Sequence, residues 1–201
     1  MIADYTKRLI EGFLAPRISA RRLLDGGLDW PVLALLFLLG YLVETIMFTA
    51  FADLGHSGPV VTRHINGLIG SMVGTAVLSA IAWQCGRIAG GTASFKDIVL
   101  VLCWLQILIA LLLPMLMPFL FSFLEAIQNM QTALQQGEEA EIMGVSGGAT
   151  AAAFGVFSVW IWLLANYIGE AHGFSSTWRV LGAILALPLL IVLLATLVTG
   201  G

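Results

Sequence analysis

The chain has 201 residues, of which 59% are hydrophobic and 10% are charged. Soluble globular domains are about 45 to 50% apolar and ~25% charged, so this chain carries more apolar surface than a soluble fold of its length can bury. The formal net charge is −3, and the basic residues are spread out rather than gathered in a stripe that binds nucleic acid. The composition excludes a soluble domain and makes lipid the expected solvent.

Residues 1–29 are expected to form a cytoplasmic amphipathic leader ahead of the membrane domain. Lys7 and Arg8 lie between apolar residues at helical spacing, which predicts a helix in the interface with its bases near anionic head groups. A second short helix is expected over residues 19–24, after Pro16. The alternative is a leader that only sets orientation. The apolar residues of the first helix are Ile2, Tyr5, Leu9, Ile10 and Phe13.

Five apolar runs of roughly 20 residues follow, each long enough to cross a ~30 Å hydrocarbon core as a helix. Unpaired backbone amides are costly in lipid, so these runs must be helical. The sequence therefore predicts an all-α membrane protein, a bundle of five transmembrane helices within residues 30–201, preceded by the amphipathic helix. The first run is too long for the apolar region of a cleaved signal peptide. The expected spans are about 30–51, 65–85, 98–123, 149–168 and 178–198.

The nine basic residues predict the orientation. Eight of them lie before the first span or beside the loops after the second and fourth spans. Only Arg63 lies in a loop on the opposite side of the membrane. The positive-inside rule then puts the N-terminus in the cytoplasm and the C-terminus outside.

Small residues mark the second span as a packing helix. Gly67, Gly70, Ser71 and Gly74 allow close approach of a neighbouring helix. We expect this span to be central, with the start of the fourth span, "GVSGGATAAAFG", as its partner. The oligomeric state stays open.

Prolines interrupt the third span in "LLLPMLMPFL". Pro114 and Pro118 each remove a backbone donor, so a kink is expected in the outer half of this span. Such a break is either a packing kink or part of a ligand site like those of transporters.

Glu44 is the one acid plainly inside a span. An ionised carboxylate there costs at least ~2.5 kcal/mol, so Glu44 should face the bundle, face a wet cavity or be protonated. It is either a protonated acid bonded between helices or a proton or cation site. Its expected partners include the carbonyl of Ala110, freed by Pro114. The candidate intramembrane polar site consists of Tyr41, Glu44, Thr45, Ser71, Thr75 and Pro114.

Two short turns are expected on the cytoplasmic side. In "GRIAGGTASFKDIV", Gly90 and Gly91 suit the end of a helix, and Ser94 with Asp97 forms a capping box. "GEAHGFSSTWR" is built alike, with Gly173 as its left-handed residue. The candidate interaction residues in these turns are Ser94, Phe95, Lys96, Asp97, Glu170, His172, Phe174 and Arg179.

No enzyme is expected. The sequence offers no nucleophile elbow, no third group to orient His172, no paired acids and no HExxH motif within the spans. No cofactor or metal is expected, and Cys85 and Cys103 are taken as reduced packing residues.

The stretches "GGTASFKDIVLVLCW" and "WIWLLANYIGEAHGFSSTWRVLGAIL", in a five-span pattern after an amphipathic leader, resemble the Yip (Ypt-interacting protein) domain family in its bacterial form. The bacterial form implies the inner membrane of a bacterium as the setting. In eukaryotes this family implies small membrane proteins that bind Rab-type GTPases. The chain lacks the long N-terminus with an Asp-Leu-Tyr-Gly-Pro type motif, so the resemblance does not carry GTPase binding over.

The expected function is a non-enzymatic membrane scaffold whose partners are the lipid bilayer and other membrane proteins. The alternative is a small-solute transporter or a lipid-handling protein. Intramembrane polar residues are sparse, which favours the scaffold; they are Glu44, Gln84, Gln106 and Asn166, with some hydroxyls.

Overall fold

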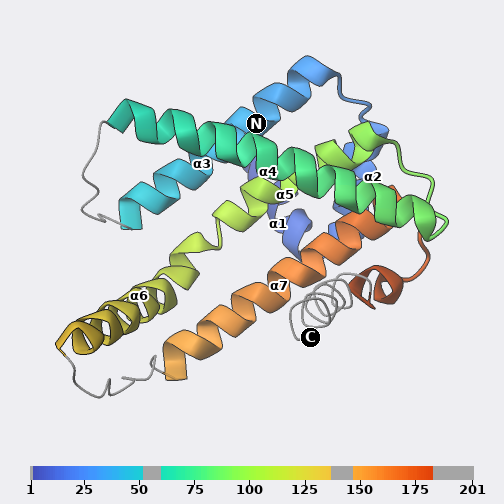
Figure 1. Cartoon of the computed structure of the whole chain (residues 1–201). Helices are drawn as coiled ribbons and strands as arrows, with labels where there is room; N and C mark the ends of the chain where they lie inside the picture. Colours follow the sequence, from blue (N-terminus) through green and yellow to red (C-terminus); the bar gives the residue numbers. More distant parts are fainter. Residues whose placement is uncertain (1, 52–59, 137–146, 183–201) are drawn as a thin grey trace, which may run out of the picture.

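The computed structural model describes residues 2–51, 60–136 and 147–182, and within these ranges every regular element is a helix (Figure 1). The expected all-α class is confirmed for this part of the chain. A further helical turn begins at Thr177. The helices are α1 (Ile2–Leu14), α2 (Pro16–Asp25), α3 (Trp30–Phe51), α4 (Val60–Ile88), α5 (Phe95–Ala110), α6 (Leu113–Gln136) and α7 (Gly147–Ala171).

Three of the described helices, α3, α4 and α7, are long and apolar enough to cross a membrane. α5 and α6 together make a fourth candidate span, bent by 68° at the break between them. The described residues thus hold three or four of the five expected spans. The fifth, expected over 178–198, lies for the most part outside the described residues.

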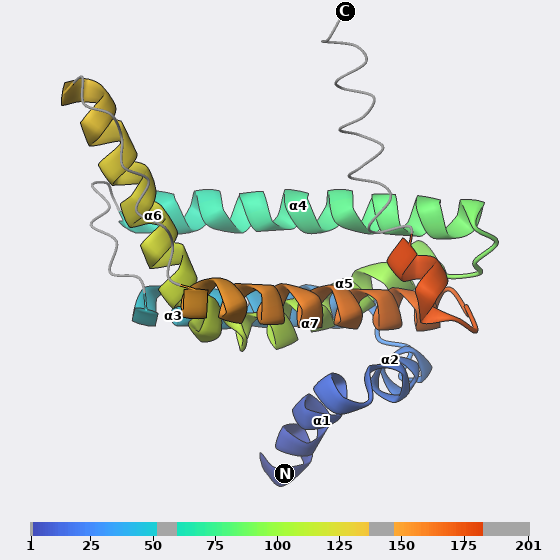
Figure 2. The ribbon, with the colours of Figure 1, turned by 90° about the horizontal axis from the view of Figure 1, so that it is seen from below.

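The candidate membrane spans form two layers. α3, α5 and α7 lie side by side in one layer, α4 lies on one face of it, and α1 and α2 lie on the opposite face (Figure 2). The centre is α5, whose Ile98, Val101 and Leu108 are fully buried against α7 residues such as Leu163. An apolar helix buried on most sides is typical of the middle of a bundle.

The expectation that the second span is central is wrong. α4 packs chiefly on α5, while α7, its expected partner, packs against α2, α5 and α6. Around Gly70 and Gly74 nothing comes within 4 Å of an added Cβ, and a Cβ added to Gly67 would meet the hydroxyl of Tyr41. Small residues permit close packing but do not by themselves supply a partner.

The proline break occurs where it was expected. In a continuous helix the amide of residue 114 would bond to the carbonyl of Ala110, and Pro114 lacks that amide. α5 therefore ends at Ala110, and α6 begins at Leu113 with Pro114 in its first turn, where proline is tolerated. Pro118 lies inside α6, and Ser122 donates a hydrogen bond to its carbonyl over 2.9 Å.

The leader forms two helices, as expected, but it docks onto the bundle. Ala20 of α2 is fully buried, and a Cβ added to Gly12 of α1 would lie 3.0 Å from Leu108. The opposite face remains open, because Ile10, Leu14 and Ile18 are all more than half exposed. The leader thus has one face against protein and one apolar face left for lipid or a partner.

Candidate functional site

The two predicted turns form as their sequences indicate. Ser94 accepts a hydrogen bond from the amide of Asp97, whose carboxylate accepts one from the amide of Ser94, completing the capping box. Gly90 has φ +88° and Gly173 has φ +71°, the left-handed values that end a helix. Gly91 does not share this conformation.

The turns are joined to each other through His172. The backbone amide of Thr92 donates to the carbonyl of His172 over 3.2 Å, although 80 residues separate them. The ring Nε2 of His172 lies 3.2 Å from the carbonyl oxygen of Ala82 in α4, and the ring stacks on Phe174 with centroids 5.5 Å apart. His172 therefore ties the end of α7 to the end of α4.

The imidazole of His172 fits this place because its neighbours have no side chains. A Cβ added to Gly86 would lie 1.9 Å from Nε2, and one added to Gly91 would lie 2.4 Å from Nδ1. The ring is buried, and Nδ1 has no hydrogen-bond partner. Burial lowers the pKa of His172; the bond to Ala82 opposes this shift and the nearby charge of Arg87 adds to it. The neutral ring, with its proton on Nε2, suits the site.

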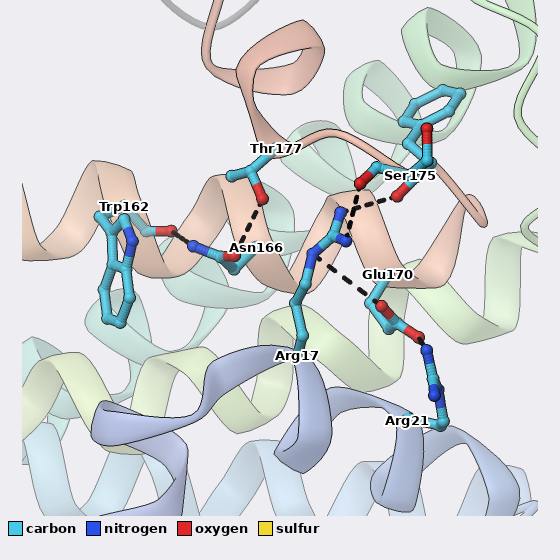
Figure 3. A network of polar contacts seen from close by, with 8 residues as sticks. Arg17, Arg21, Trp162, Asn166, Glu170, Ser175 and Thr177 are labelled. Atoms are coloured by element: carbon cyan, nitrogen blue, oxygen red, sulfur yellow. Dashed lines mark hydrogen bonds and ion pairs between the residues drawn. The ribbon is translucent and has the colours of Figure 1, made fainter.

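Glu170, near the end of α7, makes a second set of polar contacts there, with arginines of α2 (Figure 3). Its Oε1 lies 2.6 Å from Nη2 and 2.8 Å from Nε of Arg21 in α2. Arg17 Nε lies 4.0 Å from the other oxygen of Glu170. The Glu170 side chain is 11% exposed and that of Arg21 is 71% exposed, so the carboxylate is buried beneath the leader and the arginine covers it.

Arg17 also holds the turn after α7. Its two terminal nitrogens donate to the carbonyls of Phe174 over 2.6 Å and Ser175 over 3.1 Å. Past the turn, Thr177 donates to the Asn166 side chain, which donates to the carbonyl of Trp162 (Figure 3). The leader, the end of α7 and the start of the next helical turn are thus linked by one set of polar contacts.

The buried hydroxyl of Tyr167 connects α2 to α7 and α5. Tyr167 of α7 is fully buried and donates to Ser19 of α2 over 2.8 Å, and its hydroxyl accepts from Trp104 of α5 over 3.1 Å. Three helices therefore meet at one hydroxyl that has both a donor and an acceptor as partners.

The other turn residues lie at the margin of this region. Lys96 is 3.8 Å from Asp29, an ion pair whose acid is almost fully exposed. Phe95 packs edge-on against Trp83. Arg179 is exposed on the helical turn after α7. These residues take no part in the contacts of His172, Glu170 and Arg17 described above.

We call this region the platform: α2, the turn of residues 89–94 and the turn of residues 172–176. The exposed residues of the platform and of the segments that adjoin it in sequence combine basic and apolar side chains, a mixture typical of the border between lipid and water. They are Lys7, Arg8, Leu14, Ile18, Arg87, Ile88, Trp178 and Arg179.

Three residues of the expected intramembrane polar site lie together, around a residue that was not assigned to it. The side-chain amide of Gln106 donates to Glu44 over 3.0 Å and to Ser71 over 3.2 Å. Gln106 thus bridges α3 and α4 from α5. Its carbonyl oxygen lies against Gly40 and is buried without a partner.

A cleft of about 320 Å³ lies beside this bridge, with walls from α3, α4, α5, α7 and the start of α6. Glu44, Ser71 and Thr75 line it together, as expected, and so does Ala110. Tyr41 lies apart, donating to the backbone carbonyl of His64 over 2.8 Å. Pro114 is not among the lining residues; it lies in the first turn of α6, just after the break. Thr45 is half-buried on α3 and is not among them either.

Sequence reasoning missed several of the residues that hold these sites. Gln106 was recognised only as a polar residue in a span, and Arg17 and Arg21 only as markers of orientation. Gln106 and Glu44 are 62 residues apart in the sequence, and Arg21 and Glu170 are 149 residues apart. The available signal was chemical: a buried acid requires a donor, and few polar residues exist to supply one.

Within the described ranges, no three His, Cys, Asp or Glu side chains are close enough to hold a metal ion. With apolar helices, one broken span and polar anchors at one end, the chain is a multi-pass α-helical membrane protein. The Yip1 domain matches residues 11–197, so the chain belongs to the Yip1 domain family. No match was found among curated proteins or among solved structures.

Proposed function

We propose that this Yip1 domain protein is a non-enzymatic membrane scaffold that presents the platform at one face of the membrane. The observation that carries the proposal is the fixing of the leader by Arg17, Arg21 and Ser19 onto the end of α7. Ordering a leader costs conformational entropy, which these contacts offset. A fixed leader offers a surface of constant shape, as a binding partner requires.

The chemistry of the surface indicates its partner. Lys7, Arg8, Arg87 and Arg179 are exposed on segments that adjoin the platform in sequence, and so are several apolar side chains. Such a surface suits a protein with an acidic and partly apolar face at the membrane boundary. The proposed setting is the inner membrane of a bacterium, with the platform in the cytoplasm, since basic residues concentrate at this end.

The test is site-specific photocrosslinking in native membranes. A photoreactive residue is placed at Leu14 or Ile18, which are exposed next to the platform and on it, respectively, and at Leu38 or Val77 as lipid-facing controls. We expect a protein adduct of discrete mass from the first pair and not from the second. Replacing Arg17 by Gln should lower the yield of that adduct while the protein still accumulates.

Two results would contradict the scaffold. One is that the positions beside the platform give lipid adducts alone; the other is that Arg17→Gln frees the leader without changing the adduct. The alternative function, small-solute transport or lipid handling, is supported by one observation, the cleft beside Glu44.

A further inference from the structure

The cleft beside Glu44 combines one acid with a mostly apolar wall. Glu44, Ser71 and Thr75 supply a carboxyl group and two hydroxyls, and leucine and isoleucine side chains of α4, α5 and α7 supply most of the remaining surface. Its volume of about 320 Å³ lies at the lower end of the ~300–1,000 Å³ range of small-molecule sites. A ligand with a polar head and an apolar tail would complement both parts.

The charge of the head follows from the lining. None of the described residues that line the cleft is Lys, Arg or His, so the protein wall offers Glu44 no counter-charge there. Gln106 gives the carboxylate one neutral donor. An anionic head group would be repelled by Glu44, and an uncharged one would leave the acid without an ion pair in a low-dielectric place.

Trp160 adds a second feature that favours a cation. This residue lines the same cleft from α7. The face of an indole ring attracts ammonium groups, and a carboxylate together with an aromatic ring is a chemically suited pair for binding an amine.

We propose that this cleft binds a hydrophobic monocationic amine, an alkyl chain with one protonated amino group. The ammonium group pairs with Glu44 and donates to the hydroxyls of Ser71 or Thr75. The chain lies along the apolar wall. The cleft and the platform are different parts of the protein, so failure of either proposal leaves the other intact.

The experiment uses the full chain in phosphatidylcholine nanodiscs and tritiated dodecylamine, with empty nanodiscs as background. Dodecanol and dodecyl sulfate serve as neutral and anionic competitors of equal chain length. We expect saturable amine binding, with both competitors weaker by about tenfold or more, since a hydrogen bond to a charged group is lost. Glu44→Gln should weaken amine binding by about the same factor, and Glu125→Gln, on exposed α6, should not.

A second pair of variants covers the case in which Glu44→Gln does not fold. Gly74 lines the cleft and an added Cβ meets nothing within 4 Å, so Gly74→Leu should fill the cleft and abolish binding. Gly70 is equally open and is not among the lining residues, so Gly70→Leu should bind like the parent.

Three outcomes would overturn the proposal. The first is that the three amphiphiles bind alike or that none binds saturably. The second is that Glu44→Gln folds and binds the amine like the parent. The third is that Gly74→Leu, but not Gly70→Leu, reduces the amount of folded protein, which would mean that protein already fills the cleft.

Discussion

Arg21 of the leader and Glu170 at the end of α7 are joined through two nitrogens, at 2.8 and 2.6 Å from the same carboxylate oxygen. The pair connects positions 149 residues apart. The arginine is largely exposed, so its own contribution is small, in the ~0–1 kcal/mol range of surface ion pairs. The mostly buried carboxylate is the more sensitive partner, because it also faces Arg17.

Glu170→Ala is therefore expected to loosen the leader more than Arg21→Ala. The Nε of Arg17 is already buried without a hydrogen bond. Removing the acid also takes away the carboxylate that faces this arginine. We expect a loss of about 1–3 kcal/mol in leader docking for Glu170→Ala and below about 1 kcal/mol for Arg21→Ala. Hydrogen–deuterium exchange of α2 measures both. Equal exchange in the two variants would assign no special role to Glu170.

Acid should weaken the junction at His172. Burial lowers the pKa of this imidazole, so the unfolded chain takes up the proton more readily than the folded chain. The stability from the neutral ring is then full above the unfolded pKa of about 6.5 and is lost as the pH falls below it. The melting temperature of the parent should drop between pH 7.5 and 5, and His172→Phe should reduce that drop. An unchanged drop in the variant would place the titrating group elsewhere.

Gly86→Ala should be strongly destabilising. The new Cβ would lie 1.9 Å from the buried ring of His172, which cannot move away because Gly91 lies against its other side. Overpacking of this kind costs about 1–3 kcal/mol. Gly70→Ala is the matched control in the same helix: nothing lies within 4 Å of its Cβ, and alanine favours helix by ~1 kcal/mol. Thermal unfolding in detergent compares them, and equal midpoints would contradict the packing described here.

Tyr167→Phe tests the junction of the three helices. The variant keeps the ring but removes the hydroxyl that contacts Ser19 and Trp104. We expect a loss of about 1–2 kcal/mol, because the part-buried indole N–H of Trp104 and the buried hydroxyl of Ser19 lose their partner. The measurement is protease cleavage within the leader. Cleavage at the parental rate would show that apolar packing alone holds α2.

The orientation is testable with reporters at the two ends of the chain. A reporter active only in the cytoplasm should be active when fused before Met1 and silent after Gly201, as an odd number of spans with a basic N-terminal side requires. Activity at both ends would rule out the five-span count.

The sequence by itself determined the solvent of this protein, its helical class, both turns, and the position of the break. These features depend on local chemistry: apolar length, a capping box at Ser94, glycines at 90 and 173, and the missing amide of Pro114. Each is decided within a few residues of the chain, so one sequence is enough to predict it.

Only the tertiary structure decided which helix is central and which polar groups meet. Small residues suggested α4, yet Gly70 and Gly74 face open space and α5 forms the core. The partners of Glu44 and Glu170 lie far away in sequence, on helices whose rotation and depth no local pattern specifies. In lipid every helix is apolar, so packing geometry and the few available donors decide the arrangement.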